Sequence, residues 1–173
     1  MVIQKQPGEI VAVCVSDRKG VRKKNVGEAR LQPDWGIEED AHSGTGHRQI
    51  SLLAAESMAK LERALSRQSP GSDYPPFAPG DFAENLTTRG IELHTIPVGA
   101  LLRIGSEVVL RVTQIGKECH DGCAIRKLSG DCIMPREGIF ARVVEGGGVA
   151  VGDVIEVVKD ERGRRNLDEG VME

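Results

Sequence analysis

The amino-acid sequence predicts a mainly β protein, either a β-barrel or a β-sandwich, with few helices. The 173 residues include 18 Val and 12 Ile but only five aromatic residues, and β-branched side chains fit the pleated surface of a strand better than a helix. Glycine is frequent, with 21 residues, which is typical of tight turns between short strands. The strand-like segments also follow one another without the regular intervening helices of a doubly wound α/β sheet.

Length, charge and hydropathy indicate the number of domains, the kinds of partner and the location of the protein. At roughly 150 residues per domain, we expect one domain over residues 1–159, followed by a charged, flexible tail at 160–173. A net charge of −3 gives no reason to expect a nucleic-acid partner. No segment approaches the roughly 20 apolar residues of a membrane span, and residues 1–8 lack an apolar signal-peptide core. We therefore expect no membrane partner and a cytoplasmic location, where the four cysteines are thiols or ligands.

The first predicted strand covers residues 9–16, which read EIVAVCVS. Apolar residues occupy both faces of this strand, which predicts that it is well buried. The two faces carry Val11, Val13 and Val15, and Ile10, Ala12 and Cys14, respectively. Cys14 is then most simply a small core residue.

Two polar segments follow the first strand. Residues 18–24 read RKGVRKK, which indicates either a solvated loop or an anion site for a phosphate or a cofactor tail. Residues 40–48 place charged and hydrogen-bonding side chains among small residues. Small residues let the backbone approach a ligand closely, so this segment is either a binding loop or a plain loop.

The best helix prediction covers residues 49–68. Apolar residues recur there at spacings of three and four, namely at Leu53, Ala54, Met58, Leu61 and Leu65. The sequence Ser69-Pro70-Gly71 predicts the end of the helix. A Pro/Gly-rich loop over 69–80 follows and is long enough to form a rim or a lid.

Strands return in the second half of the chain. Residues 101–112 predict a β-hairpin with a two-residue type II′ turn at Gly105-Ser106. A second group of strands is expected at 140–145 and 149–158, separated by three glycines and with Gly152-Asp153 interrupting the last run.

The window from residue 114 to 132 holds three of the four cysteines and one histidine. Cys119, His120, Cys123 and Cys132 are residue types that bind zinc, but the usual pattern needs two separated pairs of close ligands. The other interpretation is one reactive thiolate at Cys119, because cations such as the flanking Lys117 and His120 lower a thiol pKa. A thiolate attacks electrophiles, carries sulfur as a persulfide or binds a soft metal. A buried structural cysteine is the plain alternative.

Four segments in order resemble the MOSC domain family, which is named for the C-terminal domain of molybdenum cofactor sulfurases. They read GIEEDAHSG running on to RQISLL, then GDFAENLTT, then PVG with LLRIG, and finally QIGKEC followed by GIFAR and VGD. The resemblance covers residues 9–158. It implies a MOSC-type closed β-barrel of mostly antiparallel strands with a few helices.

The resemblance also implies a function related to the molybdenum cofactor (molybdopterin). The cysteine at 119 would either ligate molybdenum or carry sulfur as a persulfide, and some relatives are reductases of N-hydroxylated compounds, which favours an enzyme. Pyridoxal phosphate is not expected, because it belongs to the fused desulfurase domain of larger members. The implied partners are the small-molecule cofactor and either cofactor-biosynthesis proteins or a cysteine desulfurase.

The matched segments also suggest site residues. Cys119 is expected as the metal ligand and catalytic thiolate, with His120 and Cys123 as its assistants. A pterin that carries a phosphate needs N–H donors and cations. The expected cofactor-binding residues are Asp40, His42, Arg48, Glu84, Asn85, Thr87, Thr88, Lys117 and Arg142, with His47 as a further source of charge. For Asn85, a turn or helix N-cap role is the alternative.

Two further interpretations stay open. Cys123 lies four residues after Cys119 and would resolve a persulfide by forming a disulfide. Alternatively, the protein is a non-catalytic scaffold module in which the Cys/His cluster binds structural zinc. Binding of nucleic acid through residues 18–24 is a third possibility, although the segment contains no aromatic residue for stacking.

Overall fold

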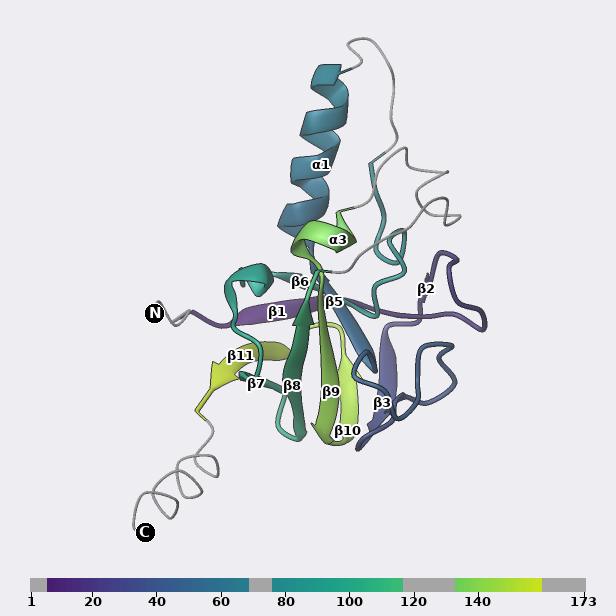
Figure 1. Ribbon diagram of the computed structural model, residues 1–173, viewed down its shortest axis with the longest axis vertical. Helices are drawn as coiled ribbons and strands as arrows, with labels where there is room; N and C mark the ends of the chain where they lie inside the picture. The colour runs from purple at the N-terminus through teal and green to yellow at the C-terminus, as the bar shows by residue number, and fades with distance from the viewer. Residues whose placement is uncertain (1–5, 69–75, 117–132, 160–173) are drawn as a thin grey trace.

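Seven strands of the described residues close into a barrel (Figure 1). The computed structural model describes residues 6–68, 76–116 and 133–159. The barrel strands, in spatial order, are β11 (Val154–Val158), β7 (Leu101–Ile104), β8 (Val108–Ile115), β9 (Ile139–Glu145), β5 (Ile50–Ala54), β6 (Leu86–Arg89) and β1 (Gly8–Val15). Pairing of β1 with β11, at Gly8 with Ile155 and Glu9 with Val154, closes the circle. The predicted closed barrel is confirmed.

The barrel is mostly antiparallel, and β5 and β6 pair in parallel. The chain covers the distance between these two strands through the helix α1 (Ala55–Gln68) and the loop after it, as a parallel connection requires. A short strand, β2 (Lys24–Asn25), extends the sheet beside β1. A separate three-stranded sheet has the order β10 (Gly147–Ala150), β3 (Glu28–Gln32), β4 (Gly36–Ile37).

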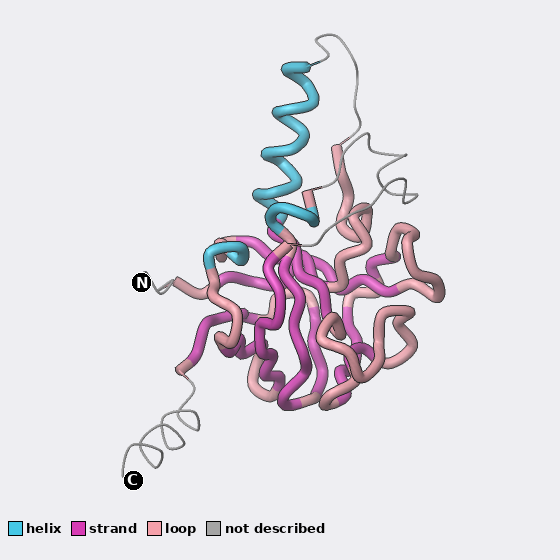
Figure 2. Tube along the Cα trace, in the orientation of Figure 1, coloured by secondary structure: helices cyan, strands magenta, loops and turns pink. Residues whose placement is uncertain are grey.

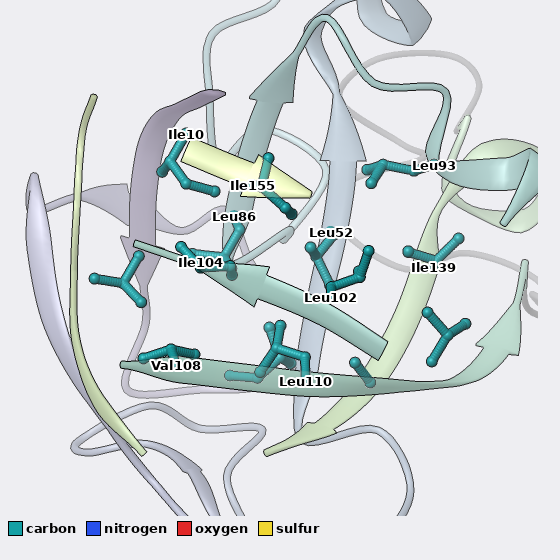
Figure 3. Close-up of a cluster of buried hydrophobic side chains, with 14 of the residues drawn as sticks. Ile10, Leu52, Leu86, Leu93, Leu102, Ile104, Val108, Leu110, Ile139 and Ile155 are labelled. Atoms are coloured by element: carbon teal, nitrogen blue, oxygen red, sulfur yellow. The ribbon is translucent and has the colours of Figure 1, made fainter. Parts of the chain in front are cut away.

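Large aliphatic side chains fill the barrel. Figure 3 shows side chains from several strands meeting inside it, among them Ile10, Leu52, Leu86, Leu102, Leu110 and Ile155, all of which are fully buried. Each such side chain contributes about 1.5–3 kcal/mol relative to an exposed position. This core explains the abundance of Val and Ile in the sequence.

A second apolar cluster lies on the outer face of β5, between the barrel and α1. Leu53 points to this face, whereas its neighbours Leu52 and Ala54 belong to the barrel core. The cluster also contains Met58 and Leu61 of α1 together with Phe82 and Phe140. The helices lie at one end of the barrel (Figure 2), where α3 (Met134–Glu137) also packs. A 3₁₀ turn, η1, covers Leu93–Thr95.

The predicted helix over 49–68 is wrong at its start and confirmed at its end. Residues 50–54 form β5, and α1 begins at Ala55 and ends at Gln68. All five residues of β5 are buried, because the strand lies between β6 and β9. A short apolar run directly before a helix cannot be separated from that helix by its periodicity.

Two local details also differ from the sequence predictions. The register between β1 and β6 shifts between Ile10 and Ala12, so Ile10 joins Val13 in the barrel core instead of sharing a face with Cys14. The hairpin of β7 and β8 is confirmed, but Ile104 pairs with Val108, so its loop has three residues instead of two. No helix of the described residues is long and apolar enough to cross a membrane.

Candidate functional site

The segment GDFAEN folds into a tight curl against the loop that carries Lys23. The Gly80 amide donates to Glu84 Oε1 at 2.6 Å, and the Gly80 carbonyl accepts from the Lys23 amide at 2.8 Å. Gly80 has φ +91°, and a Cβ there would lie 2.0 Å from the Lys23 carbonyl oxygen. Only glycine fits this position, which explains why the motif begins with Gly.

The curl buries the carboxyl group of Glu84 completely. Burial raises the pKa of Glu84 to about 8, against hydrogen bonds from backbone amides that lower it. No hydrogen bond reaches Oε2 from the described part of the chain. Glu84 is therefore protonated and neutral at pH 7.

Cys14 lies close to Glu84 on the outer face of the barrel. Burial, together with the negative charge of Glu84 when it is ionised, raises the pKa of the Cys14 thiol to about 12, although Lys23 lowers it. Cys14 is therefore a protonated thiol at neutral pH and a poor nucleophile. This agrees with the prediction of a core residue.

Asn85 connects three strands of the barrel. Its Nδ2 donates to the Cys14 carbonyl at 3.1 Å, and its Oδ1 accepts from the Ser51 amide and hydroxyl at 3.0 and 3.1 Å. These bonds link β1, β5 and the start of β6. The structure thus places Asn85 as a buried bridge, with its side-chain oxygen and its amide both engaged with the protein.

Thr87 and Thr88 are fully buried on opposite faces of β6. Thr87 pairs with Ala12 and faces the Cys14 side, whereas Thr88 pairs with Ile10 on the side of the barrel core. The Thr87 hydroxyl faces the Cys14 thiol and lowers its pKa. The Thr88 hydroxyl has no hydrogen-bond partner among the described residues, which is unusual for a buried polar group.

Lys23 and Asp40 form a buried ion pair. Lys23 Nζ lies 2.7 Å from Asp40 Oδ1, and both side chains are inaccessible to solvent. The Ser16 and His42 amides donate to the same carboxylate, each at 3.1 Å. Burial alone would raise the pKa of Asp40, but the Lys23 ammonium holds it below its ordinary value. The pair fixes the loop of residues 40–48 to the end of β1, and nothing in the basic run of the sequence distinguishes Lys23 from its neighbours.

A cavity of about 590 Å³ lies beside this ion pair. Its lining residues come from the end of β1, the basic loop and residue 39: Val15, Ser16, Asp17, Arg18, Val21, Arg22, Lys24, Val26 and Glu39. Its lining contains three cations, three valines and two carboxylates, those of Asp17 and Glu39. The basic loop of the sequence is thus one side of a cavity.

The predicted cations Arg48 and Arg142 lie in separate interactions. Arg48 Nε donates to Gln114 Oε1 at 3.1 Å, and its guanidinium lies 5.3 Å from the centroid of the Phe140 ring. Arg142 forms an ion pair with Asp34. That contact lowers the pKa of Asp34 and directs Arg142 toward the β3–β4 turn.

Gly116 marks the point where the described chain stops before the cysteine cluster. Its amide donates to the Gly138 carbonyl at 2.6 Å, and with φ +69° a Cβ would lie 2.3 Å from the Pro135 carbonyl oxygen. The described chain begins again at Ile133. The predicted residues Lys117, Cys119, His120, Cys123 and Cys132 lie outside the described residues.

Glu137 is a buried carboxylate that the sequence analysis did not single out. Its two oxygens accept from Ser57 Oγ and Lys60 Nζ of α1, each at 2.9 Å, and His94 Nδ1 lies 3.7 Å away. Burial alone would raise its pKa, but Lys60 and Ser57 hold it below the ordinary value. Glu137 therefore links α1 to α3. It directly precedes Gly138, whose carbonyl accepts from the Gly116 amide; we call this contact the Gly116 anchor.

The structure brings together one part of the predicted site. Around the end of β1 lie Asp40, through the Ser16 amide, His42, whose amide donates to Asp40, and Glu84, Asn85 and Thr87, through Cys14. Arg48 lies with Gln114 at the end of β8, and Arg142 lies with Asp34. Among the described residues, no group of three or more His, Cys, Asp or Glu is placed to hold a metal ion.

Comparisons with known proteins agree with this architecture. The family model of the MOSC domain matches residues 39–156. The crystal structure of the YuaD protein from Bacillus subtilis superposes with a TM-score of 0.71 at 20% identity, over 90% of this chain and 98% of that one. YiiM from Geobacillus stearothermophilus gives 0.65 at 21% identity, over 88% of this chain and 76% of that one.

YiiM from Escherichia coli gives a TM-score of 0.64 at 20% identity, over 90% of this chain and 71% of that one. At such identities these three likenesses show the fold alone. No curated protein matches the chain. The family model, by contrast, spans more than half of the chain and includes both the 40–48 loop and the cysteine cluster. The chain therefore belongs to the MOSC domain family, which is associated with molybdenum-cofactor-related functions.

Proposed function

We propose that the protein binds the molybdenum cofactor and that the Cys119 thiolate is its sulfur ligand from the protein. The observation that carries this proposal is the anchor at Gly116, which is held between β8 and α3 three residues before Cys119. A chain spans at most about 3.6 Å per residue. Cys119 follows Gly116 by three residues, which is at most about 11 Å of extended chain. Gly116 itself accepts from Gln114 of β8, and Gln114 in turn accepts from Arg48.

The donor chemistry fits such a cofactor. Dithiolene sulfur and a protein thiolate are soft ligands of the kind that suit a soft metal centre, and Cys119 supplies the thiolate. The phosphate of the pterin needs cations and N–H donors. The cavity at the basic loop has Arg18, Arg22 and Lys24 in its lining, together with the carboxylates of Asp17 and Glu39, and we propose that its cations receive the phosphate end.

The buried residues of the predicted set support this cavity in different ways. We expect Asp40 to act through Lys23 and through the His42 amide, because these bonds shape the rim of the loop. Asn85 is expected to frame the site, since its amide already holds β1 and β5. We also propose that further residues of the predicted set contact the cofactor directly, namely His42, Arg48, Thr87, Thr88, Lys117 and Arg142.

When bound, the cofactor supplies redox chemistry at molybdenum. The chain's own contribution is to hold one thiolate and to neutralise the phosphate. We propose the reduction of N-hydroxylated compounds as the activity to assay first. The proposed partners are proteins of cofactor biosynthesis or a cysteine desulfurase.

Sulfur carriage is the second candidate function. The observation that favours it is the second thiol of the segment, Cys123, four residues after Cys119. A persulfide on Cys119 would release its outer sulfur to an acceptor, or Cys123 would attack the inner sulfur to form a disulfide and release hydrosulfide. Mass spectrometry of freshly purified protein, with and without Cys123→Ser, tests this function through a gain of one sulfur atom.

Lys24→Ala tests whether the cavity binds the phosphate of the pterin, and Lys19→Ala is the matched control. Both lysines belong to the basic run of residues 18–24, but only Lys24 lines the cavity. Loss of a charged hydrogen bond of about 1.5–3 kcal/mol predicts at least tenfold weaker retention of pterin by Lys24→Ala. Pterin is measured by fluorescence after oxidative release. Equal retention by the two variants would exclude the cavity as the phosphate site.

A further inference from the structure

The side chain of Gln114 joins three separate parts of the chain. Its Oε1 accepts from His47 Nε2 at 2.9 Å and from Arg48 Nε at 3.1 Å, and its Nε2 donates to the Gly116 carbonyl at 2.7 Å. It therefore connects the 40–48 loop to the end of β8. The backbone carries a parallel link, because the Thr113 hydroxyl donates to the His47 carbonyl.

The donors around Gln114 leave one consistent assignment of its amide. The Nε of arginine always carries hydrogen and never accepts, so the atom facing Arg48 must be the amide oxygen. The same oxygen faces His47 Nε2, which must then carry a hydrogen. The amide nitrogen is left for the Gly116 carbonyl, which accepts. Each polar atom of Gln114 thus has a partner of the right kind, and the tautomer of a neutral His47 is fixed as Nε2–H.

The groups around Gln114 are also held in place by contacts of their own. Gln114 pairs with Phe140 across β8 and β9, and the Arg48 guanidinium lies over the Phe140 ring. Gly116 is held from its other side by the Gly138 carbonyl. Arg48 donates one N–H group, that of Nε, to Gln114. The other N–H groups of the guanidinium take no part in this bond.

We infer that Gln114 is a positioning residue, which orients Arg48 and His47 and ties both to the Gly116 anchor. Without this amide, the side chains of His47 and Arg48 lose the acceptor that they share among the described residues. Through Gln114, the side chains of His47 and Arg48 keep a fixed position relative to the end of β8, which precedes Cys119 in the sequence. The consequence for cofactor binding rests on the function proposed above, but the positioning itself does not.

Two variants of Gln114 separate the two halves of its role. Gln114→Ala removes the acceptor of His47 and Arg48 and the donor to Gly116. Gln114→Glu keeps an acceptor oxygen for His47 and Arg48 but has no N–H for the Gly116 carbonyl. Gln32→Ala is the matched control, because Gln32 also donates its amide in a hydrogen bond at the surface, to Glu38.

The first readout is nitrogen NMR of the side chains in the full chain. In wild type we expect the Nε2–H tautomer at His47 and a protected Arg48 Nε–H signal. Gln114→Ala should give a mixture of His47 tautomers and at least tenfold faster exchange of the Arg48 proton. Gln32→Ala should keep both wild-type signals, and Gln114→Glu should keep the protected Arg48 Nε–H signal. An unchanged His47 tautomer and Arg48 exchange rate in Gln114→Ala would overturn the inference.

The second readout is retention of pterin by protein made in a host that synthesises the cofactor. Gln114→Ala should retain about tenfold less pterin than wild type, with Gln114→Glu between the two. Wild-type retention by Gln114→Ala would contradict the inference. If wild type itself retains no pterin, the proposed function fails, and the NMR comparison alone then decides the positioning role.

Discussion

Glu84→Gln tests the most unusual electrostatic feature of the described part of the fold, a fully buried carboxyl group whose second oxygen has no hydrogen-bond partner there. Burial raises its folded-state pKa to about 8, from a value of 4.5 for an unburied group. Between these two values the unfolded chain ionises at Glu84 while the folded protein keeps the proton. The folded state therefore binds more protons, and stability must fall as the pH rises from 4.5 to 8.

The magnitude follows from the size of the shift. One pKa unit corresponds to about 1.4 kcal/mol, so the free energy of unfolding falls by about 1.4 kcal/mol per pH unit in this interval. Between pH 5.5 and pH 7.5 the wild type should lose about 3 kcal/mol relative to Glu84→Gln. Glutamine has the shape of the protonated carboxyl group and does not titrate, so the difference between the two proteins isolates this one group.

The assay is urea unfolding at a series of pH values for wild type, Glu84→Gln and the control Glu28→Gln. Glu28 lies on β3 with an exposed side chain. The wild-type stability should decline relative to Glu84→Gln as the pH rises, while Glu28→Gln should run parallel to wild type. A constant difference between wild type and Glu84→Gln, or one of opposite slope, would refute the reasoning, because Glu84 would then be ionised or solvated in the fold.

Three other predictions concern the same end of the barrel. Gly80→Ala should lose about 2–4 kcal/mol of stability, because Gly80 has φ +91° and a Cβ there would lie 2.0 Å from the Lys23 carbonyl oxygen. A free energy of unfolding within about 1 kcal/mol of the wild-type value would contradict the tight curl. Lys23→Met should lose about 3–5 kcal/mol by leaving Asp40 buried without its counter-ion, and the double variant with Asp40→Leu should recover part of this loss, as urea unfolding measures. Cys14 should resist iodoacetamide at pH 8 in native protein, since its pKa is about 12, and react after unfolding; mass spectrometry that finds Cys14 modified in native protein would contradict its burial.

Much of the fold could be predicted from the sequence, because it rests on local signals. The abundance of β-branched residues, the hairpin around Gly105 and the helix stop after Gln68 all depend on side-chain shape and turn chemistry. The order of four short motifs predicted the family and the closed barrel. Each of these features depends on neighbours in the sequence.

Other features depend on contacts between distant parts of the chain. The strand β5 was predicted as helix because its apolar run continues into α1, and only its pairing with β6 and β9 makes it a strand. The face of Ile10 depends on a register shift against β6. Both errors come from long-range pairing that local periodicity does not contain.

The candidate site shows the same division. The motif segments named Asp40, Glu84 and Asn85, and the structure places all three as buried residues around the end of β1. The partner of Asp40 is Lys23, one cation in a run of basic residues, and only burial distinguishes it. Gln114 lies within the motif of Cys119, but its role appears only when the 40–48 loop folds back onto β8.

The most direct test of the central claim is the molybdenum and pterin content of the protein with and without the Cys119 thiol. Wild type, Cys119→Ser and the buried-thiol control Cys14→Ser are purified from a host that makes the cofactor with molybdate supplied, and molybdenum, zinc and pterin are measured per chain. We expect molybdenum and pterin in equal amounts in wild type and Cys14→Ser, and a loss of molybdenum in Cys119→Ser. Zinc without molybdenum in wild type, or equal molybdenum in wild type and Cys119→Ser, would contradict the account.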